Sequence, residues 1–287
     1  MGSIFTTTKV EEGIMQLAHH LANIVAYKKQ EVERLKEEVC TQPDHYLSQI
    51  LNQNHLRREH FATALKGPGL SIIGEIKRQS PTRGKIGCID NPADLALKYC
   101  CGGAAAISVL TDTRGFGGSF LDMQQVSQKL QSQYSHVSVL RKDFILDPLQ
   151  LAEAIFFGAN AVLLIVSVVG ENLKFLIQEA HRLGLEVLTE IHDFSELELA
   201  LEAEASIIGI NHRNLKTFEI DLNLSESLKP FIPPQIITVA ESGIHHPIQA
   251  KRMRELGFDA VLVGEALVRS KDPALLIKQM KGEENES

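Results

Sequence analysis

Charged side chains that could act together as acids and bases stand at the ends of several short apolar segments. They comprise two lysines and three glutamates: Glu75, Lys77, Lys142, Glu190 and Glu241. Lysines and carboxylates held close together push one another's pKa values apart, so they can supply an acid and a base at one pH. Any one of these residues alone could form a salt bridge or cap a helix. Their repeated placement at segment ends favours a general acid–base site.

Alternation along a strand groups some of these side chains on one face. Glu75 and Lys77 are two positions apart, as are Asn211 and Arg213 after a later segment. Residues i and i+2 of a strand point to the same side, so each pair should enter one cavity together.

Two glycine-containing turns follow the last two apolar segments. They are Ser242-Gly243 and Val263-Gly264. Glycine lets the backbone approach a ligand closely, and backbone N–H groups at such positions bind anions. A glycine after a strand is also an ordinary turn residue, but the two turns together predict a phosphate site.

The elements that must position these groups form a regular series. Eight apolar segments alternate with amphipathic helical stretches: Ser71–Ile76, Ala104–Leu110, Val137–Leu140, Ala161–Val166, Glu186–Thr189, Ser206–Ile210, Gln235–Val239 and Ala260–Val263. Such runs are typical of parallel strands buried on both faces. Eight strand–helix units predict an α/β fold of the (β/α)8 TIM-barrel type, whose catalytic groups lie at the carboxyl ends of the strands. The rival is a doubly wound sheet, but the chain has no G-x-G-x-x-G turn.

The chain divides into an extension and a barrel. Residues 69–287 suit a catalytic barrel of about 250 residues or fewer. Residues 1–68 are predicted to be a helical extension with helices at Ile24–Val39, Asp44–Leu51 and Leu56–Leu65. One interpretation is a cap on one end of the barrel; the other is a regulatory or partner-binding segment.

Composition limits the setting of the protein. A net charge of −7 without a basic cluster argues against a nucleic-acid partner. No apolar run reaches the roughly 20 residues that span a bilayer, so no membrane association is expected. Cys40, Cys88, Cys100 and Cys101 lack metal-type spacing and are expected to be reduced thiols of a cytoplasmic protein, with no metal site.

Several motifs carry a family resemblance. The segment from Gly74 to Pro81 resembles the E-x-K-x-x-S-P signature of indole-3-glycerol-phosphate synthases, and Arg141-Lys142-Asp143-Phe144 and Ile208–Leu215 are similar to further motifs of that family. The resemblance covers residues 20–280 in unbroken order. Thr82-Arg83, His212 and Ala240 depart mildly from the family pattern.

The resemblance implies a reaction of L-tryptophan biosynthesis that needs no cofactor. The substrate would be 1-(2-carboxyphenylamino)-1-deoxyribulose 5-phosphate, which undergoes ring closure, decarboxylation and dehydration to indole-3-glycerol phosphate. Lys142 would act at the ketone oxygen, Lys77 and Glu190 as acid and base, and Glu75 would tune the lysine and the substrate hydroxyls. Which lysine acts at which step stays open.

The same resemblance implies binding roles for the remaining residues. Arg213 would pair with the anthranilate carboxylate beside Asn211, and Glu241 would bond sugar hydroxyls. Phe116 and Phe144 would pack on the aromatic ring, although each could be a plain core residue. The phosphate would be held by Ser80, Ser242, Gly243, Gly264 and the backbone of Glu265.

Alternative functions are another phosphate-binding barrel, such as a phosphoribosyl isomerase, or a non-catalytic barrel scaffold. The first would need an acid–base pair but not this set of lysines and glutamates. The chain is expected to be a monomer or a weak homodimer. Contact with other tryptophan-pathway enzymes is left open.

Overall fold

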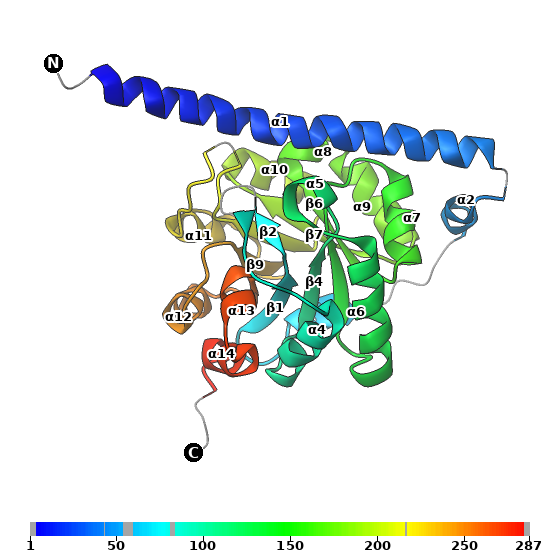
Figure 1. Cartoon of the computed structure of the whole chain (residues 1–287). Helices are drawn as coiled ribbons and strands as arrows, with labels where there is room; N and C mark the ends of the chain where they lie inside the picture. The colour runs from blue at the N-terminus through cyan, green and yellow to red at the C-terminus, as the bar shows by residue number, and fades with distance from the viewer. Residues whose placement is uncertain (1–3, 43, 54–59, 81–83, 216, 284–287) are drawn as a thin grey trace.

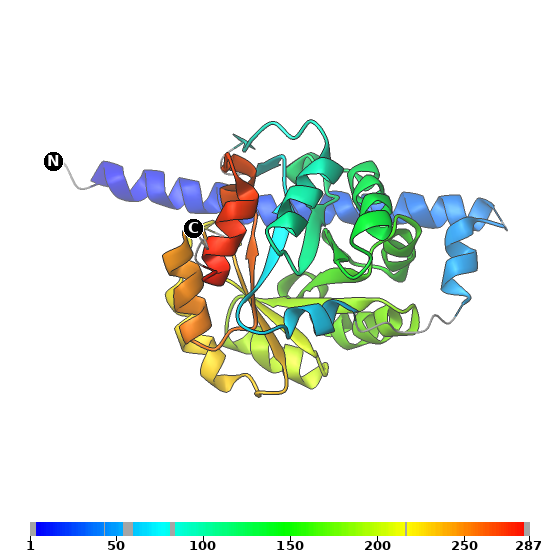
Figure 2. The ribbon, with the colours of Figure 1, turned by 90° about the horizontal axis from the view of Figure 1, so that it is seen from below.

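Eight parallel strands close into a barrel in the computed structural model (Figures 1 and 2). The structure describes residues 4–42, 44–53, 60–80, 84–215 and 217–283, and for residues 4–20 only the backbone. The strand order around the barrel is β1-β10-β9-β8-β7-β6-β5-β4. The strands are β1 (Ser71–Ile76), β4 (Ala106–Leu110), β5 (Ser138–Lys142), β6 (Ala161–Ile165), β7 (Glu186–Ile191), β8 (Ile207–Asn211), β9 (Ile237–Glu241) and β10 (Ala260–Val263).

Helices follow the strands and surround the barrel (Figure 2). The longer ones are α4 (Pro92–Cys101), α6 (Phe120–Gln133), α7 (Pro148–Phe156), α9 (Leu173–Arg182), α10 (Phe194–Glu202), α11 (Asn223–Leu228), α12 (Pro247–Glu255) and α14 (Pro273–Lys281). Short turns of helix are α5 (Thr113–Phe116), α8 (Val166–Val169), η1 (Gly170–Asn172), η2 (Lys229–Phe231) and α13 (Glu265–Arg269). This architecture confirms the predicted (β/α)8 barrel.

Alternation along each strand divides the apolar residues between two cores. Ile73, Leu140 and Leu188 belong to the cluster inside the barrel. Their chain neighbours, such as Ile72 and Val187, belong to the cluster between strands and helices. Side chains two positions beyond an inward residue point inward too. The barrel interior therefore continues upward into the polar residues at the strand ends.

The extension contacts both ends of the barrel, so the prediction of a cap on one end is wrong in this respect. Helix α1 (Ile4–Thr41) lies across the end where the strands finish, and α2 (Tyr46–Leu51) follows it (Figure 1). Helix α3 (His60–Leu65) closes the opposite end, where Phe61 and Leu65 are fully buried. Residues 54–59, which include the start of the predicted Leu56–Leu65 helix, lie outside the described residues.

Buried polar contacts fix α3 to the barrel. The carboxylate of Glu186, at the start of β7, accepts hydrogen bonds from the backbone N–H groups of Phe61 (2.6 Å) and Ala62 (3.0 Å). These N–H groups belong to the first turn of a helix and have no partner within it.

Among the described residues, no helix combines the length and apolar character needed to cross a membrane.

A small hairpin that the sequence analysis did not predict follows β1. Strands β2 (Gln79–Ser80) and β3 (Gly84–Lys85) pair in antiparallel fashion. Arg78 fixes the hairpin to α6 through two hydrogen bonds of 3.0 Å to the carboxylate of Asp122. Residues 81–83, which hold Pro81, Thr82 and Arg83, lie outside the described residues.

Candidate active site

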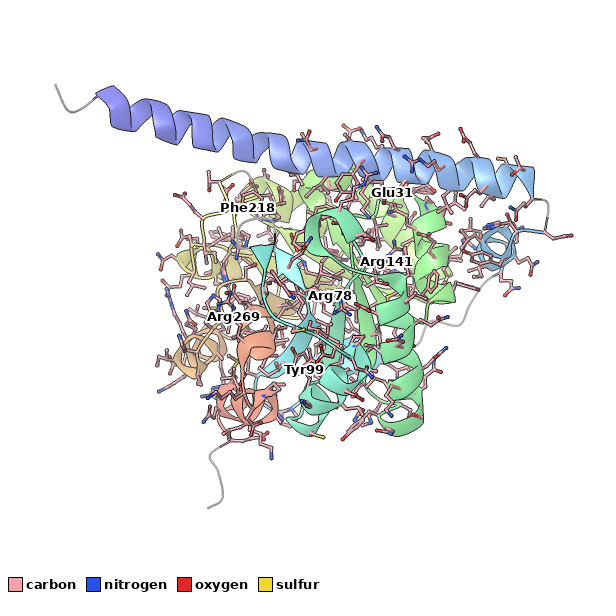
Figure 3. The ribbon with its side chains drawn as sticks, in the orientation of Figure 1. Glu31, Arg78, Tyr99, Arg141, Phe218 and Arg269 are labelled. Carbon is pink, nitrogen blue, oxygen red and sulfur yellow. The ribbon has the colours of Figure 1, made fainter. Side chains whose placement is uncertain are left out.

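A cavity opens at the mouth of the barrel, at the carboxyl ends of the strands. Every residue predicted for the site lines it: Glu75, Lys77, Ser80, Phe116, Lys142, Phe144, Glu190, Asn211, Arg213, Glu241, Ser242, Gly243, Gly264 and Glu265. Further lining residues had no assigned role: Leu110, Asp143, Leu163, Ile165, Leu215, Phe218, Ile244, His245 and Leu262. Figure 3 shows one of them, Phe218, at the upper rim on the loop after β8.

Lys142 is the central cation of the cavity. Its Nζ lies 2.9 Å from Oε2 of Glu190 and 3.3 Å from Oε2 of Glu241. Burial alone would lower the pKa of Lys142, but the negative charges of the surrounding glutamates raise that pKa well above its usual range. The side chain is therefore a charged ammonium, able to donate a proton or stabilise a developing oxyanion.

The two glutamates beside Lys142 differ in protonation. Burial opposes ionisation of Glu190, but Lys142 and His192 hold the pKa of this carboxyl well below its usual range. Burial raises the pKa of Glu241 to about 8, and the charge of Glu190 adds to this effect while Lys142 only partly offsets it. At neutral pH the site thus combines a carboxylate at Glu190 with a carboxylic acid at Glu241. The separation of pKa values agrees with the expectation from the sequence.

Asn211 lies beside Glu190 and contacts the backbone of Arg213. The Nδ2 group of Asn211 donates a hydrogen bond of 2.9 Å to Oε1 of Glu190, and its Oδ1 accepts one of 3.0 Å from the backbone N–H of Arg213. The guanidinium of Arg213 donates to the carbonyl of Phe218 at 3.1 Å. Asn211 therefore orients both the carboxylate and the start of the arginine loop.

Glu75 and Lys77 form an ion pair at the end of β1. Glu75 is buried, whereas the side chain of Lys77 is 20% exposed and reaches the cavity. The absence of a side chain at Gly264 makes space for the Glu75 carboxylate, because a Cβ at this position would collide with Oε1 of Glu75.

His192 contributes to the site although the sequence analysis gave it no role. Its Nε2 lies 3.3 Å from Oε1 of Glu190, and its Nδ1 lies 3.1 Å from Oε2 of Glu196 on α10. Burial would lower the pKa of His192, but hydrogen bonding to Glu190 and Glu196 raises it to about 10. The imidazolium therefore keeps Glu190 ionised from behind the cavity. Its place two residues after Glu190 was the available sequence signal.

The turn after β9 has an unusual backbone. Ser242 and Gly243 both adopt left-handed conformations, with φ of 64° and 78°. His212 supports this turn, since its Nδ1–H donates a hydrogen bond of 2.8 Å to the carbonyl of Ser242. Burial lowers the pKa of His212, and the neutral ring accepts from the Ser225 hydroxyl, 2.6 Å from its Nε2. Because β10 adjoins β9, this turn and Gly264 border the same part of the cavity.

Aromatic and aliphatic side chains form another part of the cavity wall. The rings of Phe116 and Phe144 lie 6.1 Å apart between centroids. Leu163 and Ile165 on β6 continue this apolar surface. The cavity can thus hold a molecule with a flat apolar portion and a polar, anionic portion.

Taken together, the barrel and its mouth define a class of protein: a (β/α)8 enzyme that carries out acid–base chemistry on a small molecule. Comparison with known proteins narrows this class. The family model for indole-3-glycerol phosphate synthase matches residues 21–280. The chain belongs to the indole-3-glycerol phosphate synthase family.

Individual relatives agree with this placement. The indole-3-glycerol phosphate synthase of Dehalococcoides mccartyi strain CBDB1 is 46% identical over 221 residues, covering 77% of this chain and 85% of the relative. The one from Opitutus terrae is 40% identical over 264 residues, covering 91% and 98%.

Solved structures of lower similarity share the fold alone. The 3-hexulose-6-phosphate synthase of Salmonella typhimurium superimposes with a TM-score of 0.57 at 16% identity, over 74% of this chain and 97% of that chain. The thiamine phosphate pyrophosphorylase of Pyrococcus furiosus also gives a TM-score of 0.57, at 15% identity, over 74% and 94%.

Proposed function

We propose that the cavity converts 1-(2-carboxyphenylamino)-1-deoxyribulose 5-phosphate into indole-3-glycerol phosphate, carbon dioxide and water. The observation that carries the assignment is the position of the Lys142 ammonium between Glu190 and Glu241 at the barrel mouth. An ammonium beside one ionised and one neutral carboxyl group supplies the acid and the base that this sequence of steps requires.

The substrate would lie with its aromatic ring against Phe116 and Phe144. Its phosphate would be held opposite, by the hydroxyls of Ser80 and Ser242 and the backbone of Gly243, Gly264 and Glu265. This arrangement follows the apolar and glycine-containing parts of the cavity wall.

The remaining polar residues would orient the substrate. Arg213 would pair with the anthranilate carboxylate. Asn211 is already bonded to Glu190 and to the Arg213 backbone, so it would act by positioning these two groups. Glu241, with its pKa raised to about 8 by burial, would donate a hydrogen bond to a sugar hydroxyl.

Ring closure would come first. The ring carbon that bears the carboxylate attacks the ketone carbon, and Lys142 gives a proton to the ketone oxygen as it becomes a hydroxyl. The carbon–carboxylate bond then breaks, carbon dioxide leaves, and its electron pair restores the aromatic ring.

Dehydration would complete the reaction. Lys77 protonates the departing hydroxyl, and Glu190 removes the proton from the adjacent carbon so that the double bond of the indole forms. Glu75 holds Lys77 in place through their ion pair. Glu190 lies 2.9 Å from Lys142, so the proton that it takes can return directly to the lysine.

A fluorescence assay for indole-3-glycerol phosphate tests the proposal. The purified wild type should form the product from the anilino-deoxyribulose phosphate without added metal or cofactor. Lys142→Ala should lower kcat about 100-fold or more, since it removes a general acid. Lys251→Ala is the matched control, because that lysine lies on α12 with its side chain 57% exposed. Folded wild type that forms no product would overturn the assignment.

A cytoplasmic location belongs to the same proposal. All four cysteines, Cys40, Cys88, Cys100 and Cys101, are free thiols, which suits a reducing compartment.

A further inference from the structure

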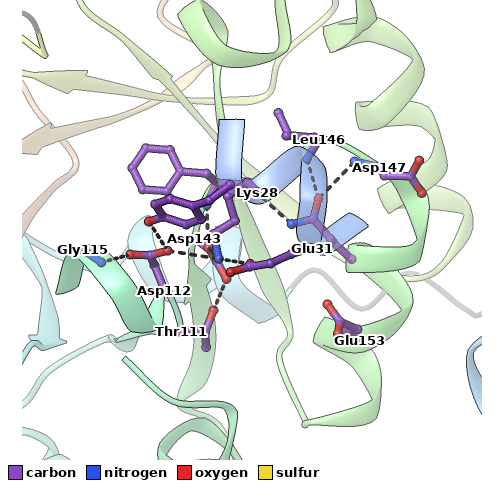
Figure 4. Close-up of polar contacts among 12 residues, drawn as sticks. Lys28, Glu31, Thr111, Asp112, Gly115, Asp143, Leu146, Asp147 and Glu153 are labelled. Atoms are coloured by element: carbon purple, nitrogen blue, oxygen red, sulfur yellow. Dashed lines mark hydrogen bonds and ion pairs between the residues drawn. The ribbon is translucent and has the colours of Figure 1, made fainter. Parts of the chain in front are cut away.

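Lys28 is a buried lysine of the N-terminal helix that lies outside the cavity wall. It is 4% exposed, on the face of α1 that packs against the barrel. Its Nζ lies 2.9 Å from Oδ1 of Asp143, 3.1 Å from Oδ1 of Asp112 and 2.9 Å from Oε2 of Glu31 (Figure 4). Both aspartate side chains are completely buried. A charge in such surroundings is tolerated only when it is paired, so these contacts depend on one another.

Asp112 holds the loop that carries one ring of the aromatic wall. Its Oδ2 accepts a hydrogen bond of 2.7 Å from the backbone N–H of Gly115, and so caps the short helix α5 that ends at Phe116. Its Oδ1 also accepts a hydrogen bond of 2.7 Å from the hydroxyl of Tyr27, the residue before Lys28 on α1.

Asp143 holds the loop that carries the other ring. Its Oδ1, the atom that pairs with Lys28, accepts a hydrogen bond of 2.8 Å from the backbone N–H of Phe144. Its Oδ2 is held from the barrel side by Thr111 at 2.6 Å and Arg141 at 3.0 Å. Asp143 thus keeps one cation if Lys28 is lost. For Asp112, Lys28 is the single cation found among the described residues.

We infer that Lys28 is a positioning residue, which ties the loops of Phe116 and Phe144 together through Asp112 and Asp143 and so sets the spacing of the aromatic wall. The inference rests on the proposed function in one respect, namely that this wall receives the aromatic ring of the substrate. Helix α1 would therefore contribute to the binding site indirectly, through the contacts of Lys28 with the buried carboxylates of Asp112 and Asp143. The ammonium stays charged because the attraction of both aspartates raises the pKa of Lys28 despite burial, which lowers it.

Replacing Lys28 by methionine tests the inference. Lys28→Met keeps an unbranched, flexible side chain of slightly shorter length and removes the charge. The KM for the anilino-deoxyribulose phosphate should rise about tenfold, equivalent to about 1.4 kcal/mol of binding, while kcat stays within about threefold. The inhibition constant of 2-aminobenzoate, which occupies only the aromatic part, should rise by a similar factor. That of inorganic phosphate should stay unchanged.

Further variants keep the test decisive if Lys28→Met does not fold. Tyr27→Phe removes one hydrogen bond to Asp112 but leaves the Asp112 carboxylate paired with Lys28. The inhibition constant of 2-aminobenzoate should rise in this variant too, but by a smaller factor. Lys28→Met combined with Asp112→Asn removes the unpaired charge and should still weaken the binding of 2-aminobenzoate. Lys36→Met is the control, since this lysine of α1 pairs with Glu33 and Asp147 with its side chain 43% exposed.

The outcomes separate this inference from the proposed function. The inference would be overturned if folded Lys28→Met bound 2-aminobenzoate and phosphate more weakly by the same factor. It would also be overturned if the binding of neither compound became weaker. If the wild type forms no indole-3-glycerol phosphate, the proposed function alone fails. Nuclear Overhauser effects between the rings of Phe116 and Phe144 then still decide about Lys28: their loss in Lys28→Met supports the inference, and their persistence contradicts it.

Discussion

The ammonium of Lys142 and the carboxylate of Glu190 meet 2.9 Å apart although β6 separates their strands. Lys142 lies on β5 and Glu190 on β7, and Glu75 and Glu241 come from β1 and β9. These are alternate strands of the barrel. In a (β/α)8 barrel, alternate strands contribute the four side chains of one interior layer. These four ionisable side chains therefore take the place of an apolar layer at the top of the barrel.

Glu190→Gln should lower kcat about 100-fold or more, because an amide cannot accept the proton removed in dehydration. KM should change little, since the side chain keeps its shape. Steady-state kinetics with the fluorescence assay would check this. Glu204→Gln is the control, because Glu204 is an exposed carboxylate that pairs with Lys174. A rate within a few-fold of wild type would remove Glu190 from the role of base.

Two histidines, His192 and the buried His212, should show opposite charge states at neutral pH. Hydrogen bonding to Glu190 and Glu196 raises the pKa of His192 to about 10, whereas burial lowers that of His212. Nitrogen-15 NMR of the imidazole rings should show His192 doubly protonated and His212 neutral, protonated at Nδ1. A neutral His192 at pH 7 would show that it does not keep Glu190 ionised. His192→Gln and His212→Gln would assign the resonances.

The stability of the protein should depend on pH through Glu241. Burial raises its pKa in the folded state from 4.5 to about 8, so the folded state binds more protons than the unfolded state between these values. The contribution of this group is fully present below pH 4.5 and is lost as pH rises through about 8.

Glu241→Gln isolates this effect, because glutamine stays neutral throughout. Urea unfolding should show the wild type losing stability relative to Glu241→Gln as pH increases from about 5 to about 9. Comparison of the two proteins cancels the contribution of His192, which acts in the same direction over a higher range. A constant difference between them would mean that Glu241 is ionised at neutral pH.

Gly264→Ala should disturb the catalytic layer from the side. The new Cβ would collide with Oε1 of Glu75 and displace the carboxylate that pairs with Lys77. We expect kcat/KM to fall about tenfold or more, which corresponds to about 1.4 kcal/mol in the transition-state barrier. Gly67→Ala is the control, since the nearest atoms to its Cβ would lie at 3.6 Å. Full activity in Gly264→Ala would show that Glu75 tolerates displacement.

The barrel could be predicted from the sequence because strand and helix periods alternate without interruption. Each predicted strand corresponds to one in the structure, with ends that differ by at most two residues. The largest consequence of these differences is that β5, β7 and β9 continue far enough to include Lys142, Glu190 and Glu241. Once the strand order was known, the convergence of their side chains followed from barrel geometry.

The support for the site was harder to predict, because it depends on contacts between distant segments. The buried stripe of α1 includes Ile24, Lys28 and Val32 at successive intervals of four, whereas the adjacent Lys29 is exposed. A lysine within an apolar stripe was the signal, but its partners 84 and 115 residues further along the chain, Asp112 and Asp143, are evident only from the fold. The cap that Glu186 provides for α3 has the same origin.

Strand β7 bears two inward-facing carboxylates four residues apart, Glu186 at its beginning and Glu190 near its end, with Leu188 between them. Glu186 accepts a hydrogen bond from α3, which closes one end of the barrel, and Glu190 faces the cavity at the other end. At about 3.3 Å per residue they are separated by roughly 13 Å of packed interior. Substitutions at the base and at the mouth are therefore expected to act additively, as they do at well-separated sites. Residues that line the cavity could thus be varied in search of a new reaction while the contacts between Glu186 and α3 are left unchanged.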